Sequence, residues 1–507
     1  MNDWLSERSG SSPSHPALIF ERYVWTYAEL DACVSQLCGR LAARGVMPGQ
    51  RVAAYLPNRP EYVALIHALA RLGTVLLPLN TRLTAPEIAF QLGAAQVDWL
   101  IYGDGTAPGI TALPVRVGAI PLDSDTLTGG RDPNWGARPI NLSDPAAILF
   151  TSGTTGQPKG VVLTWGNFHH SALASAQRLG SGPDDRWLVC LPLYHVGGLS
   201  IVLRCCLFGT TVVLHERFEA GAVAGALPGV TLVSLVPTML RRVLAVLEAR
   251  DFPANVRAVL LGGAAAPAGW VAECAARGVP VALTYGLTEA SSQVATATPA
   301  EVRRKPGSVG KPLGGVELRI ANYANDHVGE ILVRGPIVMA GYLGEVPVGE
   351  GWLSTGDLGW LDEDSDLLVV QRRADLIVTG GENVYPAEVE AALLAHPAVR
   401  EACVVGLADA EWGQIVGAVV VVGWGEAFAE DPCDSRRRLA ANASPLHGGP
   451  EEELNTFLRE RLAGYKIPRH WRFTDELPQT ASGKVSRNAV LALFEQTIGI
   501  EAQDVDH

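Results

Sequence analysis

The sequence predicts an α/β protein. A large N-terminal domain of parallel-type sheets and helices, with a small β subdomain, is expected to precede a smaller α+β C-terminal domain. The chain has 507 residues, which is more than one ordinary hydrophobic core holds. Helix-like and strand-like patterns alternate through residues 24–92, which indicates a largely parallel sheet covered by helices. Short strands and turns fill residues 307–343, and we assign them to the β subdomain.

The alternation in residues 24–92 rests on local signals. Thr26 precedes a helical pattern and Glu29 follows three residues later, which is the arrangement of a capping box. This helix is predicted to run to about Arg44, where Gly45 ends it. The elements expected next are a strand at 51–56, a helix at 61–72 and a strand at 74–78.

Composition and charge narrow the possible functions. The net charge is −13 and the isoelectric point is about 5.4, which excludes a general binder of nucleic acids or anionic membranes. The eight cysteines include no C-x-x-C pair, so neither a zinc site nor a disulfide framework is predicted. The N-terminus lacks the basic and apolar layout of a signal peptide, and the apolar run at 415–424 is too short to span a bilayer. A soluble, cytoplasmic protein is therefore expected.

The most informative stretch of the chain is a polar loop at residues 151–160, TSGTTGQPKG. Apolar residues 146–150 before it and 161–163 after it are typical of strands. Its glycines let backbone N–H groups turn toward an anion, its hydroxyls add donors, and Lys159 adds a charge that suits a phosphate. The other predicted phosphate-binding residues are Thr151, Ser152, Gly153, Thr154, Thr155 and Gly156. The loop is not a Walker A motif, because a strand rather than a helix follows Lys159. A polar hairpin turn is the alternative.

An arginine in an apolar stretch is the next candidate for a functional role. Residues 198–209, GLSIVLRCCLFG, form an apolar helical pattern with one charge, Arg204. An arginine in such surroundings is costly unless it meets an anion, and its planar fork suits a carboxylate. We assign Arg204 to a carboxylate of the substrate, with snorkelling to the surface as the alternative. His195 precedes this stretch, and a lone histidine is more often packed or solvated than functional.

A strand at 259–263 ends in the small residues Gly262, Gly263 and Ala264. Small residues at a strand end let a flat ring lie against the backbone. We therefore predict a wall for adenine or for an aryl group, with a tight turn as the alternative.

The string YGLTE places a ring, a glycine turn, a hydroxyl and a carboxylate directly after another predicted strand. Tyr285 can stack on a base at the Gly286 turn, and Thr288 can bond a phosphate oxygen. Glu289 can hold Mg²⁺, which prefers oxygen ligands. An ordinary helix start is the alternative. The residues expected to line the acid pocket are Arg204, Gly262, Ser291 and Ser292.

Three features follow further along the chain. Asp357 lies in the string STGDLG, where a carboxylate fixed in a turn suits a ribose diol, although a solvated Asp-turn is the alternative. Pro386 opens a predicted helix, and residues 423–450 are polar and are interpreted as an insertion. Lys484 lies on a Gly-flanked loop and is free to reach into a cleft, with a solvated lysine as the alternative.

Taken in order, TSGTTGQPKG, YGLTE and STGDLG resemble motifs of the adenylate-forming family of acyl- and aryl-CoA synthetases, peptide-synthetase adenylation domains and luciferases. The resemblance implies an adenylation domain at 1–371, a hinge at 372–376 and a mobile lid domain at 377–507. The hinge is placed loosely, because the family usually has Gly or Asp where this chain has Gln371.

The resemblance also implies roles for single residues. His195 would gate or line the acyl channel, and Arg372 would contact the ribose and phosphates of the nucleotide. Lys484 would neutralise charge during adenylation. The residues that would meet the pantetheine arm of CoA are Gly380, Gly381, Glu382 and Asn383.

The implied activity is that of a ligase with two half-reactions. A carboxylate attacks the α-phosphate of ATP with Mg²⁺ present, and a thiol then displaces AMP. The segments PLYHVGGLSIVLR, VSLVPTMLRR, YGLTEASSQV and GSVGKPL are most similar to a branch of the family whose acid carries a second carboxylate. The alternatives are another aryl- or fatty-acyl-CoA ligase, a stand-alone adenylation enzyme that loads a carrier protein, and an inactive binding protein. Expected partners are a small carboxylic acid, ATP and CoA, with no nucleic acid and no membrane span; the oligomeric state, a homo-oligomer included, stays open.

Overall fold

The computed structural model describes most of the chain. The described residues are 2–103, 106, 117–122, 135–136, 138–152, 158–248, 250–264, 266–321, 328–349, 351–371, 376–422, 449–478, 485–487 and 489–494. The chain divides into two compact units. The first comprises residues 1–81, 88–151 and 159–373, and the second comprises residues 82–87, 152–158 and 374–507.

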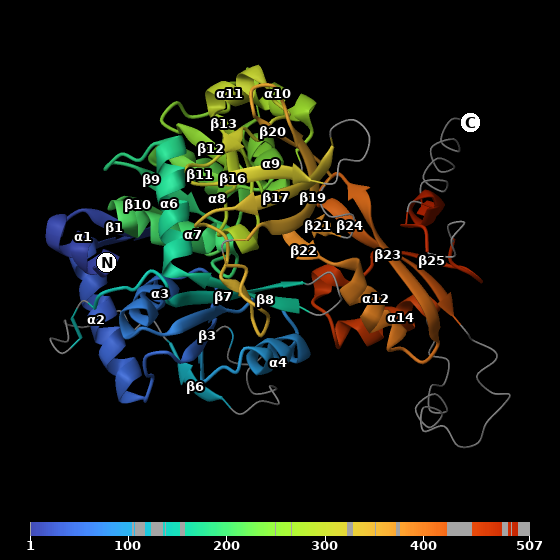
Figure 1. Ribbon diagram of the computed structural model, residues 1–507, viewed down its shortest axis with the longest axis horizontal. Helices are drawn as coiled ribbons and strands as arrows, with labels where there is room; N and C mark the ends of the chain where they lie inside the picture. The colour runs from blue at the N-terminus through green and yellow to red at the C-terminus, as the bar shows by residue number, and fades with distance from the viewer. Residues whose placement is uncertain are drawn as a thin grey trace. The chain divides into compact units, whose positions relative to one another are not determined.

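A nine-stranded sheet in the first unit has the strand order β15-β14-β13-β12-β11-β9-β10-β1-β2 (Figure 1). The strands from β13 to β1 are parallel to one another, whereas β2 at one edge and β14 and β15 at the other pair antiparallel. The strands are β1 (Pro16–Phe20), β2 (Tyr23–Thr26), β9 (Arg186–Val189), β10 (Thr211–Leu214), β11 (Leu232–Leu235), β12 (Ala258–Leu261), β13 (Val281–Tyr285), β14 (Ala295–Ala297) and β15 (Lys311–Pro312). Because parallel strands end at the same edge of a sheet, the loops after β9, β11, β12 and β13 gather there.

A seven-stranded sheet in the same unit has the order β18-β8-β7-β4-β3-β5-β6. The strands are β3 (Arg51–Tyr55), β4 (Val75–Pro78), β5 (Trp99–Tyr102), β6 (Gly118–Pro121), β7 (Pro145–Ser152), β8 (Pro158–Thr164) and β18 (Gly341–Tyr342). The chain enters the predicted phosphate loop from β7 and leaves it into β8. A strand therefore follows Lys159, as the sequence predicts, and a Walker A arrangement is excluded.

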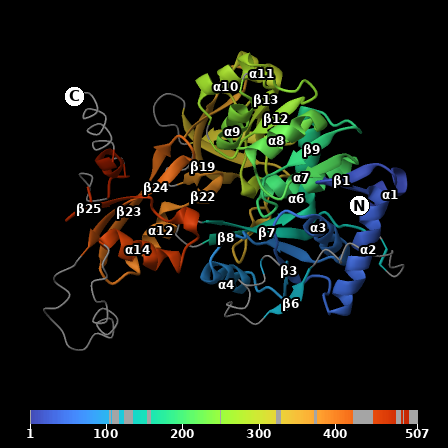
Figure 2. The ribbon, with the colours of Figure 1, turned by 180° about the vertical axis from the view of Figure 1, so that it is seen from behind.

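Helices pack on these sheets, and neighbouring pairs include α2 with α3, α6 with α7 and α8 with α9 (Figure 2). Their bounds are α1 (Trp4–Ser11), α2 (Tyr27–Ala43), α3 (Pro60–Leu72), α4 (Ala85–Ala94), α6 (Trp165–Leu179), α7 (Val196–Phe208), α8 (Ala220–Ala226), α9 (Pro237–Leu247), α10 (Ala268–Ala276) and α11 (Pro299–Arg304). The capping box predicted for α2 is confirmed, because Glu29 N donates to Thr26 Oγ1 at 3.2 Å and Thr26 N donates to the Glu29 carboxylate at 2.8 Å. The predicted ends of this helix therefore agree with the observed ends to within about one residue.

The β subdomain is an antiparallel sheet with the order β16-β17-β19-β20. Its strands are β16 (Glu317–Ala321), β17 (Gly329–Arg334), β19 (Leu353–Leu361) and β20 (Leu367–Gln371). The expectation that residues 307–343 form this subdomain needs a correction, since β15 and β18 pair with the two large sheets instead. A strand of two residues is too short to show a hydrophobic periodicity, so the sequence does not predict which sheet it joins.

The second unit is built on a five-stranded sheet, order β22-β21-β24-β23, with β25 parallel to β24. Its elements are β21 (Ile377–Thr379), β22 (Glu382–Val384), α12 (Pro386–Leu394), β23 (Val399–Asp409), β24 (Gly413–Val422), α14 (Pro450–Arg459) and β25 (His470–Phe473). Residues of β23 and β24 alternate between two buried clusters, one on each face of the sheet. Pro386 is the first residue of α12, as predicted.

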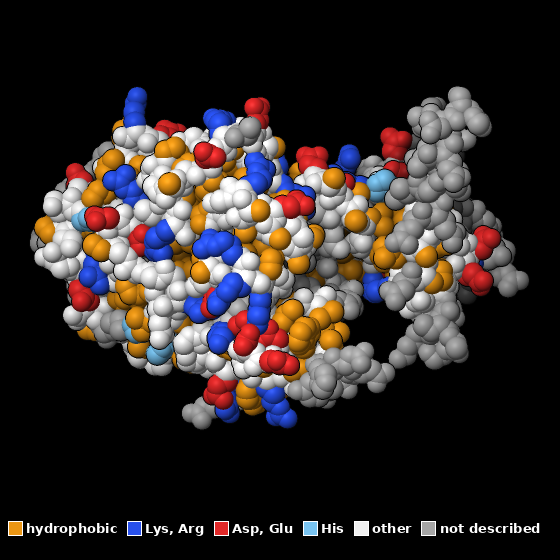
Figure 3. All heavy atoms as spheres, turned by 90° about the horizontal axis from the view of Figure 1, so that it is seen from above, with side chains coloured by type: hydrophobic (Ala, Val, Ile, Leu, Met, Phe, Trp, Pro, Cys, Tyr) orange, Lys and Arg blue, Asp and Glu red, His pale blue; other side chains and the backbone are white. Residues whose placement is uncertain are grey.

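The α/β fold class is confirmed. The space-filling view in Figure 3 shows acidic and basic side chains interspersed over the face that it presents. The seven described cysteines are all buried. Within the described residues, no helix has the length and the apolar character that crossing a membrane requires.

Candidate active site

The predicted ring wall and the YGLTE string lie at the ends of two adjacent parallel strands, β12 and β13. Gly262 follows β12, and a Cβ at this position would lie 2.6 Å from the Thr284 side chain on β13. Glycine is therefore required for the two strand ends to approach each other. Gly263 and Ala264 continue the same loop, so the structure brings the predicted wall beside Tyr285.

The loop after β13 folds tightly back on itself. A Cβ at Gly286 would lie 1.6 Å from the carbonyl oxygen of Ser292, so only glycine fits. Ser292 adopts φ +104°, a strained value for a residue with a side chain. Ser291 is fully buried, and its hydroxyl donates to the carbonyl of Ile337 at 2.8 Å. Ser291 thus ties this loop to the neighbouring chain, and the pocket-lining role of both serines stays a prediction.

Tyr285 and Asp357 are in direct contact. The hydroxyl of Tyr285 donates to Asp357 Oδ2 at 2.7 Å, and both side chains are buried. Asp357 lies inside strand β19 rather than in the turn that the sequence suggested. The pairing register of β19 with β20 shifts next to it, between Leu358 and Gly359, and such an irregularity re-aims side chains locally. The residues predicted for the base and for the ribose are therefore neighbours.

Glu289 is only 4% exposed and lies in the 3-10 turn Thr288–Ala290, where Thr288 is half-buried. Its Oε1 accepts a hydrogen bond from the hydroxyl of Tyr342 at 3.0 Å. Its backbone carbonyl accepts one from Met339 N at 2.8 Å. One carboxylate that is fixed in this way fits Mg²⁺, which binds through one or two carboxylates together with substrate phosphates.

Lys159 belongs to the predicted phosphate loop, and the structure places it on β8, which begins at Pro158. Its Nζ is 2.9 Å from Glu345 Oε1 and 4.9 Å from the centre of the Tyr342 ring. Thr151 and Ser152 end β7 on the other side of the loop. The predicted loop residues Gly153, Thr154, Thr155 and Gly156 lie outside the described residues.

Helix α7 carries the two residues predicted to face the acid. His195 is its N-cap residue and lies half-buried, with its ring 4.8 Å from that of Tyr194. Arg204 is 3% exposed, and its guanidinium lies 4.9 Å from the centre of the Trp187 ring on β9. Its Nε and Nη2 atoms have no hydrogen-bond partner among the described residues. Burial lowers the pKa of Arg204 to about 10, so the side chain remains charged near neutral pH.

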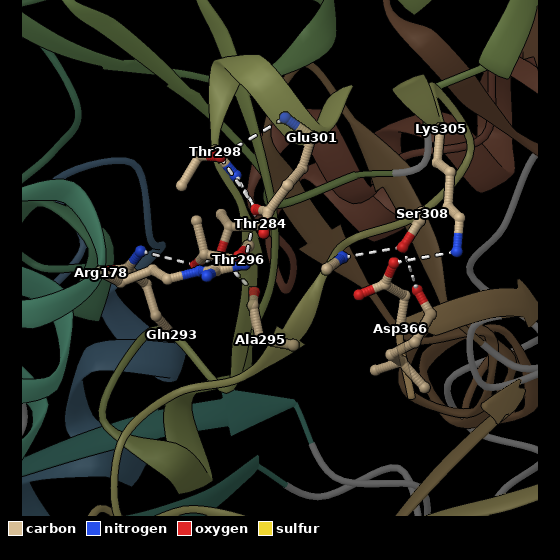
Figure 4. Close-up of polar contacts among 12 residues, drawn as sticks. Arg178, Thr284, Gln293, Ala295, Thr296, Thr298, Glu301, Lys305, Ser308 and Asp366 are labelled. Carbon is tan, nitrogen blue, oxygen red and sulfur yellow. Dashed lines mark hydrogen bonds and ion pairs between the residues drawn. The ribbon is translucent and has the colours of Figure 1, made fainter. Parts of the chain in front are cut away.

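A network of hydrogen bonds supports strand β13, which leads into the YGLTE string (Figure 4). Arg178 of α6 donates to the Thr296 carbonyl at 2.7 Å, and its Nη2 reaches Glu301 Oε2 at 2.6 Å. The hydroxyls of Thr284 and Thr296 lie 2.8 Å apart. These bonds join α6, α11, β13 and β14, so the base of the YGLTE string is held rigidly.

The same network continues at Lys305, whose ammonium contacts three aspartates of the β19–β20 turn, at 2.7 Å for Asp362 and 3.2 Å for Asp366. Asp362, Asp364 and Asp366 are the only group of metal-ligand spacing that occurs within the described ranges. Because Lys305 already supplies a positive charge there, we assign this cluster a structural role, in which it holds the β19–β20 turn against Lys305.

The predicted CoA-facing residues belong to the second unit. Gly380 and Gly381 form the turn between β21 and β22, where Gly380 N donates to the Trp412 carbonyl at 2.9 Å. Glu382 is 4% exposed, whereas Asn383 is exposed. Arg372 and Lys484 lie outside the described residues, and their roles stay predictions.

Sequence reasoning missed three residues of this region. Tyr342 joins Glu289 and Lys159, Glu345 pairs with Lys159, and Trp187 lies against Arg204. Only the pairing of β18 with β8 brings Tyr342 to this place, and a two-residue strand gives no periodic signal.

Comparison with known proteins identifies the class. The family model for the AMP-binding enzyme matches residues 5–343, and the model for the AMP-binding enzyme C-terminal domain matches residues 388–484. The chain therefore belongs to the AMP-binding enzyme family, which confirms the resemblance seen in its motifs.

Individual relatives are more specific. The 2-succinylbenzoate–CoA ligase of Bacillus cereus (strain Q1) is 39% identical over 510 residues, which cover 98% of this chain and 99% of the relative. A solved structure of o-succinylbenzoate CoA synthetase from Bacillus subtilis, a double mutant bound with the product analogue OSB-NCoA, has 37% identity and a TM-score of 0.84, and covers 96% of this chain and 98% of that one. The same synthetase in complex with ATP and magnesium ion has 38% identity and a TM-score of 0.69, covering 96% and 99%.

Proposed function

We propose that this protein is an AMP-forming acid–CoA ligase that converts 2-succinylbenzoate to 2-succinylbenzoyl-CoA in menaquinone biosynthesis. The class rests on family membership and on the convergence of Tyr285, Glu289, Asp357 and Lys159 in one unit. The substrate rests on Arg204, a buried cation to which the described residues offer no anion, and on the names of the relatives.

The geometry suits activation of a carboxyl group. In the first half-reaction a carboxylate oxygen bonds to the α-phosphorus of ATP, and pyrophosphate leaves. Positioning and neutralisation of charge account for most of the catalysis of such a transfer. Lys159 and Thr288 would hold phosphate oxygens, Asp357 would accept hydrogen bonds from the ribose hydroxyls, and Tyr285 would orient both Asp357 and the base. Bound at Glu289, Mg²⁺ would offset phosphate charge.

The second half-reaction transfers the acyl group. The thiol sulfur of CoA bonds to the carbonyl carbon of the acyl adenylate, the bond to the phosphate oxygen breaks, and AMP leaves. We assign the approach of the pantetheine arm to the turn at Gly380–Asn383. His195, at the start of α7, would line the passage between nucleotide and acid. Lys484 and Arg372 would act in the adenylation step.

Arg204 favours a diacid over a simple acid. An isolated charge in an apolar interior is costly, and here burial is reflected in the lowered pKa of the guanidinium. A carboxylate in bidentate contact would satisfy the donors that the described residues leave unpaired. One carboxyl group of 2-succinylbenzoate is activated, and the other is available for this contact. A fatty acid or a simple aryl acid would leave Arg204 unpaired.

The test is a screen for AMP release with ATP, Mg²⁺ and CoA across aromatic and aliphatic acids, with 2-succinylbenzoate included. We expect the highest kcat/KM for 2-succinylbenzoate, with AMP and the CoA thioester formed in equal amounts. Higher efficiency with a fatty acid would contradict the substrate assignment. AMP release that requires a carrier protein and ignores CoA would contradict the class of ligase.

A further inference from the structure

The carboxylate predicted to hold magnesium and the lysine predicted to hold phosphate are joined by one side chain that sequence reasoning did not single out. Glu289 comes from the loop after β13, and Lys159 comes from β8, which belongs to the other large sheet of the first unit. Tyr342 contacts both. Its hydroxyl donates to Glu289 Oε1 at 3.0 Å, and its ring centre lies 4.9 Å from Lys159 Nζ.

The backbone fixes the position of Tyr342 on both sides. Strand β18 pairs antiparallel with β8, which sets Tyr342 opposite Val161. Leu343 N also donates to the carbonyl of Gly160 at 2.7 Å. On the other side, Met339 N donates to the carbonyl of Glu289 at 2.8 Å. The short segment 339–343 therefore bridges the phosphate-loop strand and the Glu289 turn.

The two contacts of Tyr342 act on different groups. A hydroxyl that donates to one carboxylate oxygen fixes the rotamer of Glu289 and leaves Oε2, to which no described residue donates, for a cation. An aromatic face beneath an ammonium attracts it through the ring quadrupole, which restrains where Lys159 reaches. A phenylalanine at this position would retain the second contact and lose the first.

We infer that Tyr342 is a positioning residue for the magnesium–nucleotide complex, orienting Glu289 through its hydroxyl and Lys159 through its ring. This inference rests on the proposed function. It assigns Tyr342 no contact with the reacting atoms. Removing the hydroxyl weakens metal binding, and removing the ring weakens metal-free nucleotide binding as well.

The experiment measures equilibrium binding by the full chain. Mn²⁺, which electron paramagnetic resonance detects, replaces Mg²⁺, and the nucleotide is α,β-methylene ATP, which the adenylation step does not cleave. Tyr342→Phe is expected to raise the Kd of Mn²⁺ about 10- to 100-fold, as loss of an outer-shell partner does. Its Kd for the nucleotide in EDTA stays at the wild-type value. Tyr342→Leu is expected to raise that metal-free Kd as well, by about two- to fivefold.

Two controls separate positioning from general damage. Tyr55→Phe removes a hydroxyl that donates only to a backbone carbonyl, that of Thr81 at 3.3 Å, and both Kd values should stay at the wild-type level. In a Glu289→Gln background, Tyr342→Phe should change the Kd of Mn²⁺ no further, because its effect passes through Glu289.

A wild-type Kd for Mn²⁺ in Tyr342→Phe would overturn the inference and leave the proposed function intact. The inference would also be overturned if Tyr342→Phe raised the Kd of Mn²⁺ by the same factor in the Glu289→Gln background as in the wild type. The hydroxyl would then act on metal binding by a route other than Glu289. A wild-type chain that binds no Mn²⁺ with the nucleotide would overturn the proposed function together with the inference.

Discussion

Two arginines in the first unit are almost equally buried, and their surroundings are opposite. Arg71 is 2% exposed and Arg204 is 3% exposed. Arg71 Nε donates to Asp3 at 2.6 Å and its Nη2 donates to Asp31 at 2.6 Å. Two serine hydroxyls complete the cluster, so every nitrogen of the guanidinium has a partner. Arg204 has the Trp187 ring beside it, and its Nε and Nη2 have no hydrogen-bond partner in the described parts of the chain.

The pKa values follow this difference. Burial alone would lower the pKa of Arg71, but Asp3 and Asp31 outweigh it and raise the pKa above its ordinary value. Burial lowers the pKa of Arg204 to about 10, and no carboxylate of the described residues opposes this shift. A chain that can pair a buried arginine internally does so at Arg71. This difference supports the proposal that Arg204 meets an anion of the substrate, because the described residues offer it none.

The largest expected effect is on stability. Arg71→Met leaves Asp3 and Asp31 buried without their cation, which should lower the free energy of unfolding by about 3–5 kcal/mol. Arg204→Met removes a buried charge to which the described residues offer no anion, so the free energy of unfolding should be unchanged or raised. Thermal unfolding of both variants and the wild type measures this. A midpoint that falls as far in Arg204→Met as in Arg71→Met would show that Arg204 is a structural residue.

A second prediction concerns Lys484, which is assigned to the site from the sequence and lies outside the described residues. Lys484→Ala should slow adenylation about a hundredfold, or ~3 kcal/mol of barrier, because a pre-organised charge is lost. Thioester formation from supplied acyl adenylate should be spared. ATP–pyrophosphate exchange and CoA-thioester formation measure the two steps, with Lys311→Ala, an exposed lysine on β15, as the control. Equal loss in both steps would refute the role.

The smallest expected effect concerns Lys159. It has one partly exposed acidic partner, whereas Arg71 has two buried ones and Arg204 has none among the described residues. Its ion pair with Glu345 is partly exposed, with side-chain exposures of 33% and 51%. Such a pair contributes at most about 1 kcal/mol. In the proposed site a phosphate competes with Glu345 for Lys159, so Glu345→Gln should lower the Kd of ATP by up to about fivefold. Isothermal titration measures it.

Glu317→Gln is the matched control, because it breaks another exposed ion pair, with Arg334 in the β subdomain. Both variants remove one acidic charge, so a general effect of net charge would appear in each. An ATP affinity that rises equally in the two variants would remove Glu345 from the nucleotide site.

The sequence predicts the local elements of this fold well. The capping box of Thr26 and Glu29, and the helix start at Pro386, each depend on residues close in sequence, and both are confirmed. The family is confirmed for a similar reason, since its motifs are contiguous strings. Pairing between distant segments was harder: β15 and β18 leave the β subdomain for the large sheets, and Asp357 lies in a strand.

Within the candidate site, residues that carry distinctive chemistry in a short string could be proposed from sequence, and their roles stay predictions. Tyr285, Glu289 and Arg204 are of this kind. Tyr342 and Trp187 could not be found, because each acts only through contact with a residue far along the chain. An aromatic residue in a strand has a packing role by default, and only the fold reveals which charged group lies against it.

The central claim is that Arg204 receives a second carboxylate of the acid, and a cycle of protein and substrate changes tests it. The kcat/KM for CoA-thioester formation is measured for wild type and Arg204→Met with 2-succinylbenzoate and with its two monoacids, 4-oxo-4-phenylbutanoate and 2-propanoylbenzoate. Only the monoacid that keeps the activated carboxyl group can react, and with it the kcat/KM values of the two proteins should differ little. With 2-succinylbenzoate the wild type should gain a coupling free energy of about 2–5 kcal/mol. A coupling free energy near zero would contradict the account.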